Sequence, residues 1–248
     1  VQMLLERGVA GIIFISGLHA DTTTDPDRYI ALRDRNLPLV LVNGFIEGVD
    51  APFISNDDVA SMGLALEHLV SLGHREIGLA VGPDRYVPVI RKIAGFRHSM
   101  QELTGRSDVD DLRERSLFSV EGGATAAGRL LDRGATAVVC GSDLMALGAI
   151  REARKRGLNV PRDFSVVGVA ASHWADQATP PLTAADIPAK EMSRVAVDLM
   201  MRQLRSPDAP PRHVLLKPLI TLRASTGRCR PVPGSQPEPE FPDFDLKF

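Results

Sequence analysis

The sequence has few of the residues that mark metal or redox chemistry. Its 248 residues include two cysteines, Cys140 and Cys229, and six histidines. Two distant cysteines without a paired spacing predict neither a zinc site nor a disulfide framework, so a reduced, cytoplasmic setting fits best. His68 and His74 lie six residues apart, and the i, i+4 spacing that puts two ligands on one helix face is missing. We therefore expect no metal and no cofactor.

Excess charge and long apolar runs are also missing. The formal net charge is −2, whereas a DNA-binding segment normally has a basic face. No run approaches the ~18 apolar residues of a membrane span, and Val1–Gly8 has no signal-peptide pattern. Instead, it resembles the end of an amphipathic helix. No nucleophile elbow, P-loop or dinucleotide fingerprint occurs, so we do not expect an enzyme.

Short apolar runs alternate with helical periods along most of the chain. This alternation predicts an α/β fold in which helices cover both faces of parallel sheets. The expected strands are Gly11–Ser16, Leu39–Val42, Ile77–Val81, Ser116–Val120, Ala137–Cys140, Ser165–Val169 and Leu182–Ala185. The expected helices are Asp27–Arg35, Asp58–Leu72, Val89–Leu103, Ala124–Arg133, Asp143–Arg156 and Ala189–Leu204.

Five segments together resemble one known family. In chain order they are Glu67–Gly78 (EHLVSLGHREIG), Arg91–Phe96 (RKIAGF), Ser142–Gly148 (SDLMALG), Val160–Thr183 and Leu222–Thr226 (LRAST). Each is a weak to moderate signal alone, but in this order over about 220 residues they strongly resemble the effector domain of the LacI/GalR transcriptional regulators. The resemblance implies two doubly wound parallel-sheet subdomains of the periplasmic binding protein type I kind. It also implies a small-molecule effector in the cleft between them, a homodimer, and DNA contact only through a helix-turn-helix absent from this chain.

The same resemblance predicts the domain boundaries. We expect residues 1–72 and 186–206 to form the first subdomain and residues 73–185 and 207–228 the second. Residues 229–248, which are rich in proline and acidic residues, are expected to be a disordered tail. The first subdomain is expected to be truncated, with Gly11–Ser16 as an unprotected sheet edge.

Seven residues are candidates for the cleft. Lys92 stands where the family usually carries a ligand-binding arginine, and Arg91 beside it is the alternative. Each of the others has a simpler structural role, because Asp57, Ser142 and Asp143 can cap helices and Tyr86 and Trp174 can be surface aromatics. The candidate ligand-binding residues are Asp57, Tyr86, Arg91, Lys92, Ser142, Asp143 and Trp174.

Several positions depart from the family pattern. Ala170 and Ala171 replace an acidic pair, and Ile187 replaces a common glutamine. A buried ligand hydroxyl left unpaired costs about 1–3 kcal/mol, so we expect an effector that is sugar-like or less polar. The competing interpretation is a solute-binding protein of a sugar transport system, which shares the fold. A sugar-processing enzyme is the third, and no catalytic constellation supports it.

Overall fold

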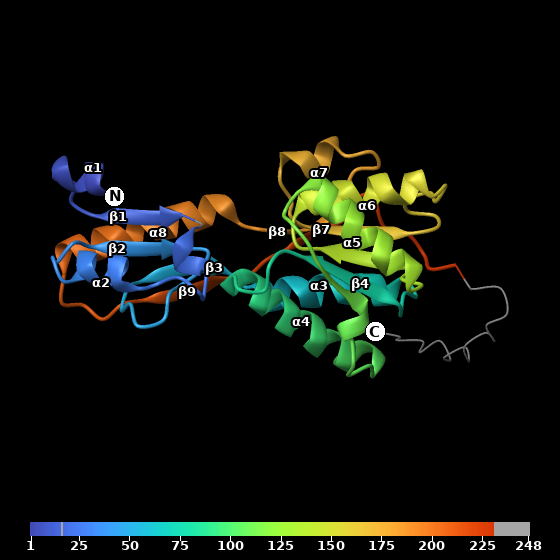
Figure 1. Cartoon of the computed structure of the whole chain (residues 1–248), viewed down its shortest axis with the longest axis horizontal. Coiled ribbons are helices and arrows are strands. Elements are labelled where there is room, and N and C mark those ends of the chain that lie inside the picture. Colours follow the sequence, from blue (N-terminus) through green and yellow to red (C-terminus); the bar gives the residue numbers. More distant parts are fainter. Residues whose placement is uncertain (16, 231–248) are drawn as a thin grey trace, which may run out of the picture.

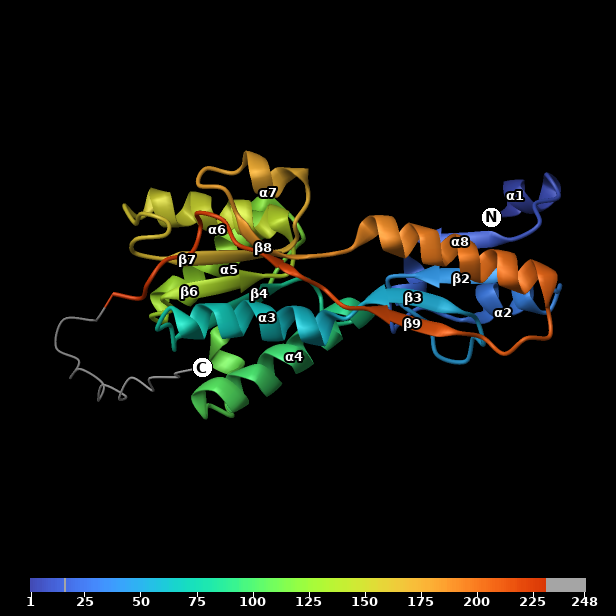
Figure 2. The same ribbon diagram turned by 180° about the vertical axis from the view of Figure 1, so that it is seen from behind.

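The computed structural model describes residues 1–15 and 17–230, and these residues form two α/β lobes joined by three chain crossings (Figures 1 and 2). The expected disordered tail lies outside the described residues from position 231 onward. No helix in the described part of the chain is both long and apolar enough to cross a membrane.

The first lobe is a four-stranded parallel sheet in the order β1-β2-β3-β9. Its strands are β1 (Ile12–Ile15), β2 (Leu39–Val42), β3 (Phe53–Asn56) and β9 (His213–Leu216). Its helices are α1 (Gln2–Glu6), the 3₁₀ turn η1 (Leu18–Ala20), α2 (Asp27–Arg33) and α8 (Ala189–Arg205). Side chains alternate across β2, so Leu39 and Leu41 pack with Tyr29 of α2, whereas Val40 and Val42 pack on the α8 side. Among the described strands β1 pairs only with β2.

The second lobe is a six-stranded sheet in the order β10-β8-β7-β6-β4-β5, in which only β10 is antiparallel. Its strands are β4 (Ile77–Val81), β5 (Arg113–Arg115), β6 (Ala137–Cys140), β7 (Ser165–Ala170), β8 (Thr183–Asp186) and β10 (Ile220–Thr221). Its helices are α3 (Asp58–Ser71), α4 (Val87–Thr104), η2 (Asp110–Leu112), α5 (Val120–Asp132), α6 (Asp143–Lys155) and α7 (His173–Gln177). One apolar cluster joins α3 and α4 to the sheet, and a second joins α5 and α6 to its other face.

Two of the three predicted crossings between the lobes are wrong. Helix α3 was expected in the first lobe, but Met62, Leu66 and Leu69 are fully buried in the core of the second. The first crossing therefore follows β3 and does not lie near residue 73. Strand β9 was expected in the second lobe, but it pairs in parallel with β3, so the third crossing lies between β9 and β10. The second crossing, after Asp186, lies where it was expected.

The prediction of a strand at Ser116–Val120 is also wrong. The strand here is β5, which begins at Arg113 and has charged residues at all three positions, so no apolar run marks it. Ser119 instead caps α5, because its side chain accepts a hydrogen bond from the Gly122 N–H at 3.0 Å.

The carboxyl ends of the parallel strands of both sheets point toward the region between the lobes (Figure 1). In the first lobe β3 leads into α3, and in the second β4, β6 and β7 lead into α4, α6 and α7. Open parallel sheets bind ligands at this end of their strands. The fold therefore places loops and helix starts of both lobes around one cleft.

Candidate effector cleft

Buried polar atoms without a partner lie at the carboxyl ends of strands in both lobes. Six side-chain atoms within the described ranges are buried and make no hydrogen bond: His19 Nδ1, Asn56 Oδ1, Asp58 Oδ2, Asp143 Oδ1, Ser172 Oγ and Asp186 Oδ1. All six belong to residues at the end of a strand or within four residues after it. Because native structures leave few such atoms unpaired, each calls for an explanation, and a bound ligand is one. Four of the six are carboxylate or amide oxygens, so these atoms mainly accept hydrogen bonds.

Lys92 and Asp58 form a buried ion pair where α3 and α4 begin. Lys92 Nζ lies 2.5 Å from Asp58 Oδ1, and the two side chains are 8% and 1% exposed. Asp57, one residue earlier, caps α3 by accepting a hydrogen bond from the Ala60 N–H at 3.0 Å. The lysine at the family's arginine position therefore has a carboxylate partner of its own, and the second oxygen of Asp58 stays unpaired.

Arg91 reaches the first lobe beside that pair. Its Nη1 donates to Ser55 Oγ at 3.0 Å, and its guanidinium lies 5.5 Å and 5.8 Å from the ring centroids of Phe45 and Phe53. Such a cation over aromatic rings is attracted by their quadrupoles. Arg91 and Phe45 also line a pocket of about 450 Å³, whose remaining lining residues are Thr22, Thr24, Pro26, Ile46, Glu47, Val87 and Ile90.

A second contact between the lobes runs through Asp21, Arg85 and Tyr86. Arg85 Nε donates to Asp21 Oδ2 at 2.8 Å, the Thr22 N–H donates to the Arg85 carbonyl at 2.9 Å, and Arg85 lies over the Tyr86 ring. Burial alone raises the pKa of Asp21, but hydrogen bonds from Thr23 and Arg85 outweigh it and hold the pKa below its ordinary value. Tyr86 therefore lies at the junction of the lobes, half-buried against the apolar cluster that joins α3 and α4 to the second sheet.

Ser142 and Asp143 begin α6 after β6, the strand next to β4. Ser142 Oγ accepts a hydrogen bond from the Met145 N–H at 3.3 Å, which is the capping role considered from the sequence. Asp143 Oδ2 accepts one from the Ser172 N–H at 2.6 Å, so the starts of α6 and α7 are linked. Gly168 packs closely against this carboxylate, because a Cβ on Gly168 would lie 2.6 Å from Asp143 Oδ1.

The loop after β7 carries the departures from the family pattern. Ala170 and Ala171 have positive φ angles of 132° and 47°, which residues other than glycine rarely adopt. Strain of this kind is found at functional sites. Trp174, three residues on, is 54% exposed, and its ring lies 6.0 Å from that of His173. The expected contact between Trp174 and a ligand stays a prediction.

Asp186 connects two of the crossings. Its Oδ2 accepts a hydrogen bond from Thr221 Oγ1 at 2.9 Å, and its N–H donates to the Leu219 carbonyl at 2.7 Å. The segments that leave and re-enter the second lobe are therefore held side by side at the edge of the cleft.

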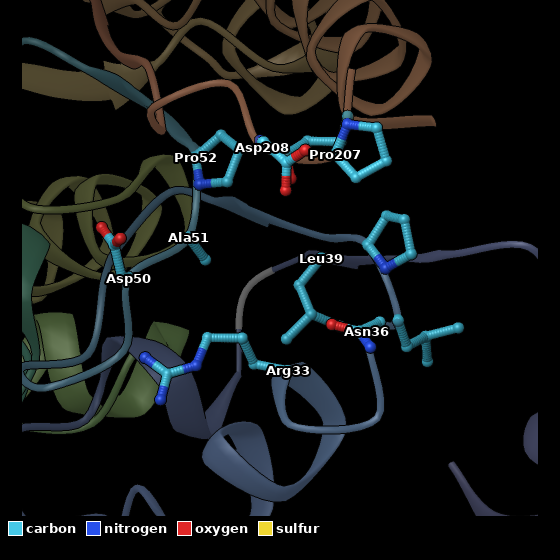
Figure 3. Close-up of a pocket in the computed structure, with 11 residues that line it drawn as sticks. Arg33, Asn36, Leu39, Asp50, Ala51, Pro52, Pro207 and Asp208 are labelled. Carbon is cyan, nitrogen blue, oxygen red and sulfur yellow. The ribbon is translucent and has the colours of Figure 1, made fainter. Parts of the chain in front are cut away.

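A different hollow lies at the opposite end of the first sheet. Arg33, Asn36, Asp50 and Asp208 are among the residues that line a space of about 130 Å³ near the start of β2 and β3 (Figure 3). It lies at the amino-terminal ends of β2 and β3, away from the carboxyl ends at which open parallel sheets bind ligands, so it is a weaker candidate.

The structure brings the predicted residues into two groups at the carboxyl end of the second sheet. Asp57, Tyr86, Arg91 and Lys92 surround the starts of α3 and α4, while the others follow β6 and β7. Sequence reasoning missed several polar residues of the cleft: His19, Asp21, Asn56, Ser172 and Asp186. Asp186 directly follows an expected strand and could have been found by that rule. Asp21 becomes visible only through its contact with Arg85, 64 residues away.

Comparison with known proteins supports a regulatory role for this architecture. Residues 66–226 match the family described as periplasmic binding protein-like domain. The chain is 50% identical over 242 residues to the HTH-type transcriptional regulator reg1 of Streptomyces lividans, covering 96% of this chain and 69% of the relative. It is 49% identical over 241 residues to the HTH-type transcriptional regulator MalR of Streptomyces coelicolor, with the same coverage. The chain thus spans about two thirds of the length of these relatives.

Solved structures of regulators share the fold. A complex of the transcriptional regulator CelR with cellobiose has a TM-score of 0.80 at 27% identity, covering 90% of this chain and 68% of that one. A LacI family regulator from Enterococcus faecium with bound ribose has a TM-score of 0.81 at 26% identity, with coverages of 92% and 84%. The lac repressor dimer bound to its operator and the anti-inducer ONPF has a TM-score of 0.76 at 25% identity, with coverages of 91% and 77%.

Proposed function

Because the chain belongs to the LacI family of transcriptional regulators, whose effector-binding domain it represents, we propose that its cleft binds a polyhydroxylated, sugar-type effector. The relatives are regulators, which argues against the transport alternative. We also propose that the domain catalyses no reaction and works in the cytoplasm, where a regulator meets DNA.

One observation carries this proposal, namely the unpaired buried polar atoms at the carboxyl ends of strands in both lobes. Sugar hydroxyls are strong hydrogen-bond donors, and carboxylate and amide oxygens such as Asp143 Oδ1 and Asn56 Oδ1 accept them. The apolar part of the pocket beside Phe45 and Ile90 suits the C–H face of a sugar ring. These hydrogen-bond acceptors belong to residues other than the acidic pair that Ala170 and Ala171 replace. We therefore expect a sugar in place of a less polar effector.

The predicted site residues have different roles in this proposal. Asp143, Arg91 and Tyr86 contact the effector or its immediate surroundings. Asp57 and Ser142 hold the helix starts in place. Lys92 acts through Asp58, whose free oxygen accepts a ligand hydroxyl.

Binding of the effector would change the relative orientation of the two lobes. His19 and Asn56 belong to the first lobe, and Asp143 and Ser172 to the second. A ligand that bonds to both groups favours the arrangement of lobes in which both reach it, which is a shift between existing states. In the proposed dimer this shift would reposition DNA-binding heads, as the operator-bound lac repressor dimer suggests.

Calorimetric titration of the purified chain with mono- and disaccharides tests the proposal. We expect at least one sugar to bind with a micromolar Kd and to raise the free energy of unfolding by about 2.7 kcal/mol at a hundredfold excess over Kd. Asn56→Ala should weaken that binding at least tenfold. Asn36→Ala, at the opposite end of the first sheet, is the matched control and should leave the Kd unchanged. Equal affinities for both variants would rule out the cleft as the site.

A further inference from the structure

We infer that the effector is electrically neutral, a polyhydroxylated molecule without a phosphate or carboxylate group. This inference rests on the proposed function, because it concerns the charge of the molecule bound in the cleft. Neutral sugars and sugar phosphates would both satisfy a sugar-type effector. The charges around the cleft separate the two classes.

The helix starts that could hold a phosphate are already occupied by the protein. Phosphates bind to the free N–H groups and positive dipole end of a helix N-terminus. In α3, α5 and α6 a side chain takes one of these N–H groups: Asp57 accepts from Ala60, Ser119 from Gly122 and Ser142 from Met145. Each of these helices therefore offers an anion fewer donors than an uncapped helix would.

The first turns of the same three helices also carry carboxylates. They are Asp58 in α3, Glu121 in α5 and Asp143 in α6. Asp58 is paired with Lys92 and Glu121 with Arg151, whereas Asp143, which is 3% exposed, has no cation partner among the described residues, so little screens its charge. An incoming phosphate would meet this uncompensated negative charge at the start of α6.

Cations around the cleft are already engaged. Lys92 is paired with Asp58, and Arg85 with Asp21. Arg91 bonds to Ser55 and covers the Phe45 and Phe53 rings, without a carboxylate partner among the described residues.

Helix α4 is the exception to the acidic pattern. Its N-terminus has no side-chain cap and its first turn has no acidic residue, whereas α2, α7 and α8, which also lack a side-chain cap, each have one. An anionic effector would therefore be expected to bind beside α4 and Arg91. Elsewhere at the carboxyl end of the second sheet Asp143 and Asp186 each keep a free oxygen, and no ion pair of either is found among the described residues. An effector that contacts these carboxylates must donate hydrogen bonds to them, which a hydroxyl does and a phosphate dianion does not.

Matched pairs of ligands test the inference on the purified chain. The probes are glucose with glucose 6-phosphate, maltose with maltose 6′-phosphate and cellobiose with cellobiose 6-phosphate, titrated by calorimetry at 0.15 M salt. We expect the neutral member of the best-binding pair to bind at least tenfold more tightly than its phosphate. Tighter binding of the phosphate would overturn the inference and leave the proposed function intact. If no member of any pair binds, the proposed sugar effector fails, and this inference fails with it.

A charge-neutral variant shows whether the named carboxylate sets the preference. Asp143→Asn should reduce the ratio of the two Kd values at least threefold, because repulsion of the phosphate is relieved while the cap at Ser142 stays. A purely structural role would change both affinities in parallel and leave the ratio constant, which would contradict the assignment. Asp132→Asn, at the far end of α5 where Asp132 pairs with Arg156, is the control and should leave the ratio unchanged.

Discussion

Buried histidines make the stability of this domain depend on pH near neutrality. Burial lowers the pKa values of His19, His68 and His74 below the ordinary 6.5. His74 lies within hydrogen-bonding distance of Thr136, Ser165 and the Gly227 carbonyl, so it fastens the last described segment to the second sheet. A neutral imidazole suits this place, and a charged one does not.

We expect the free energy of unfolding to be highest above pH 6.5 and to fall as the pH drops through the lowered pKa values of the folded state. The unfolded histidines take up protons near pH 6.5 while the folded ones still resist, so acid favours the unfolded state. Urea unfolding at pH 8.0, 7.0, 6.0 and 5.5 measures this. His74→Ala should cost about 1–3 kcal/mol at pH 8 and flatten the curve. His98→Ala should do neither, because His98 is 63% exposed. An unchanged slope in the His74 variant would contradict the assignment.

At the scale of elements, glycines set how closely α5 and α6 approach. A Cβ on Gly148 would lie 2.0 Å from the Val120 carbonyl oxygen, and one on Gly123 would lie 2.1 Å from that of Met145. Both neighbours are backbone atoms, so the helices would have to move apart. Gly63 in α3 differs, because its Cβ would meet nothing nearer than Ser99 Oγ at 3.7 Å.

Replacing glycine by alanine should therefore change the free energy of unfolding in opposite directions at two helical positions. Gly148→Ala is expected to destabilise the domain by about 1–3 kcal/mol, the typical cost of overpacking. Gly63→Ala is expected to stabilise it by up to about 1 kcal/mol, because alanine favours a helix interior over glycine. Thermal and urea unfolding of the two variants measure the difference. A neutral Gly148→Ala would show that the two helices separate easily.

Elements with a strong local pattern could be predicted from the sequence, and elements held by distant contacts could not. The fully apolar runs at β2, β4 and β6 gave the right strands, because both faces of each are covered. Strand β5 escaped because an edge strand tolerates charge, and its Arg113, Glu114 and Arg115 look like a loop. In the site, Asp57, Ser142 and Asp143 were all expected as caps; the structure confirms Asp57 and Ser142, whereas Asp143 lies in the first turn of α6 and accepts a hydrogen bond from the Ser172 N–H. The pairing of Lys92 with Asp58 depends on how α3 packs against α4, which no local pattern states.

The contact between the lobes is where a residue change should alter effector binding without altering either core. Asp21→Asn removes the charge that pairs with Arg85, whose side chain is 49% exposed. Such partly exposed pairs contribute about 0.2–1 kcal/mol, so we expect the effector Kd to rise by no more than about fivefold. Calorimetry measures the Kd, and Asp34→Asn, which disrupts a surface pair with Arg33, is the control. A change in Kd equal to that of the control would show that the contact does not support the bound state.

For the whole molecule, the proposed homodimer requires apolar surface on the outside of the lobes. Helix α8 provides it, because Val197, Met201 and Leu204 recur on one face and are 51%, 40% and 38% exposed. The opposite face of α8 packs against the first sheet through Met192, Ala196 and Leu199. A charge on the outer face should therefore disturb association and spare folding.

We expect the chain to sediment as a dimer at micromolar concentration and Met201→Glu to raise the dimer dissociation constant at least tenfold. The midpoint of thermal unfolding should stay within a few degrees at a concentration where both proteins are monomeric, because the substituted side chain does not enter the core. Lys190→Glu, at the start of the same helix and outside the apolar row, controls for added negative charge and should leave the constant unchanged. Sedimentation equilibrium over a range of concentrations measures all three proteins. A monomeric unsubstituted chain at high micromolar concentration would refute the proposed dimer for this chain, whereas a dimer unaffected by Met201→Glu would move the interface away from α8.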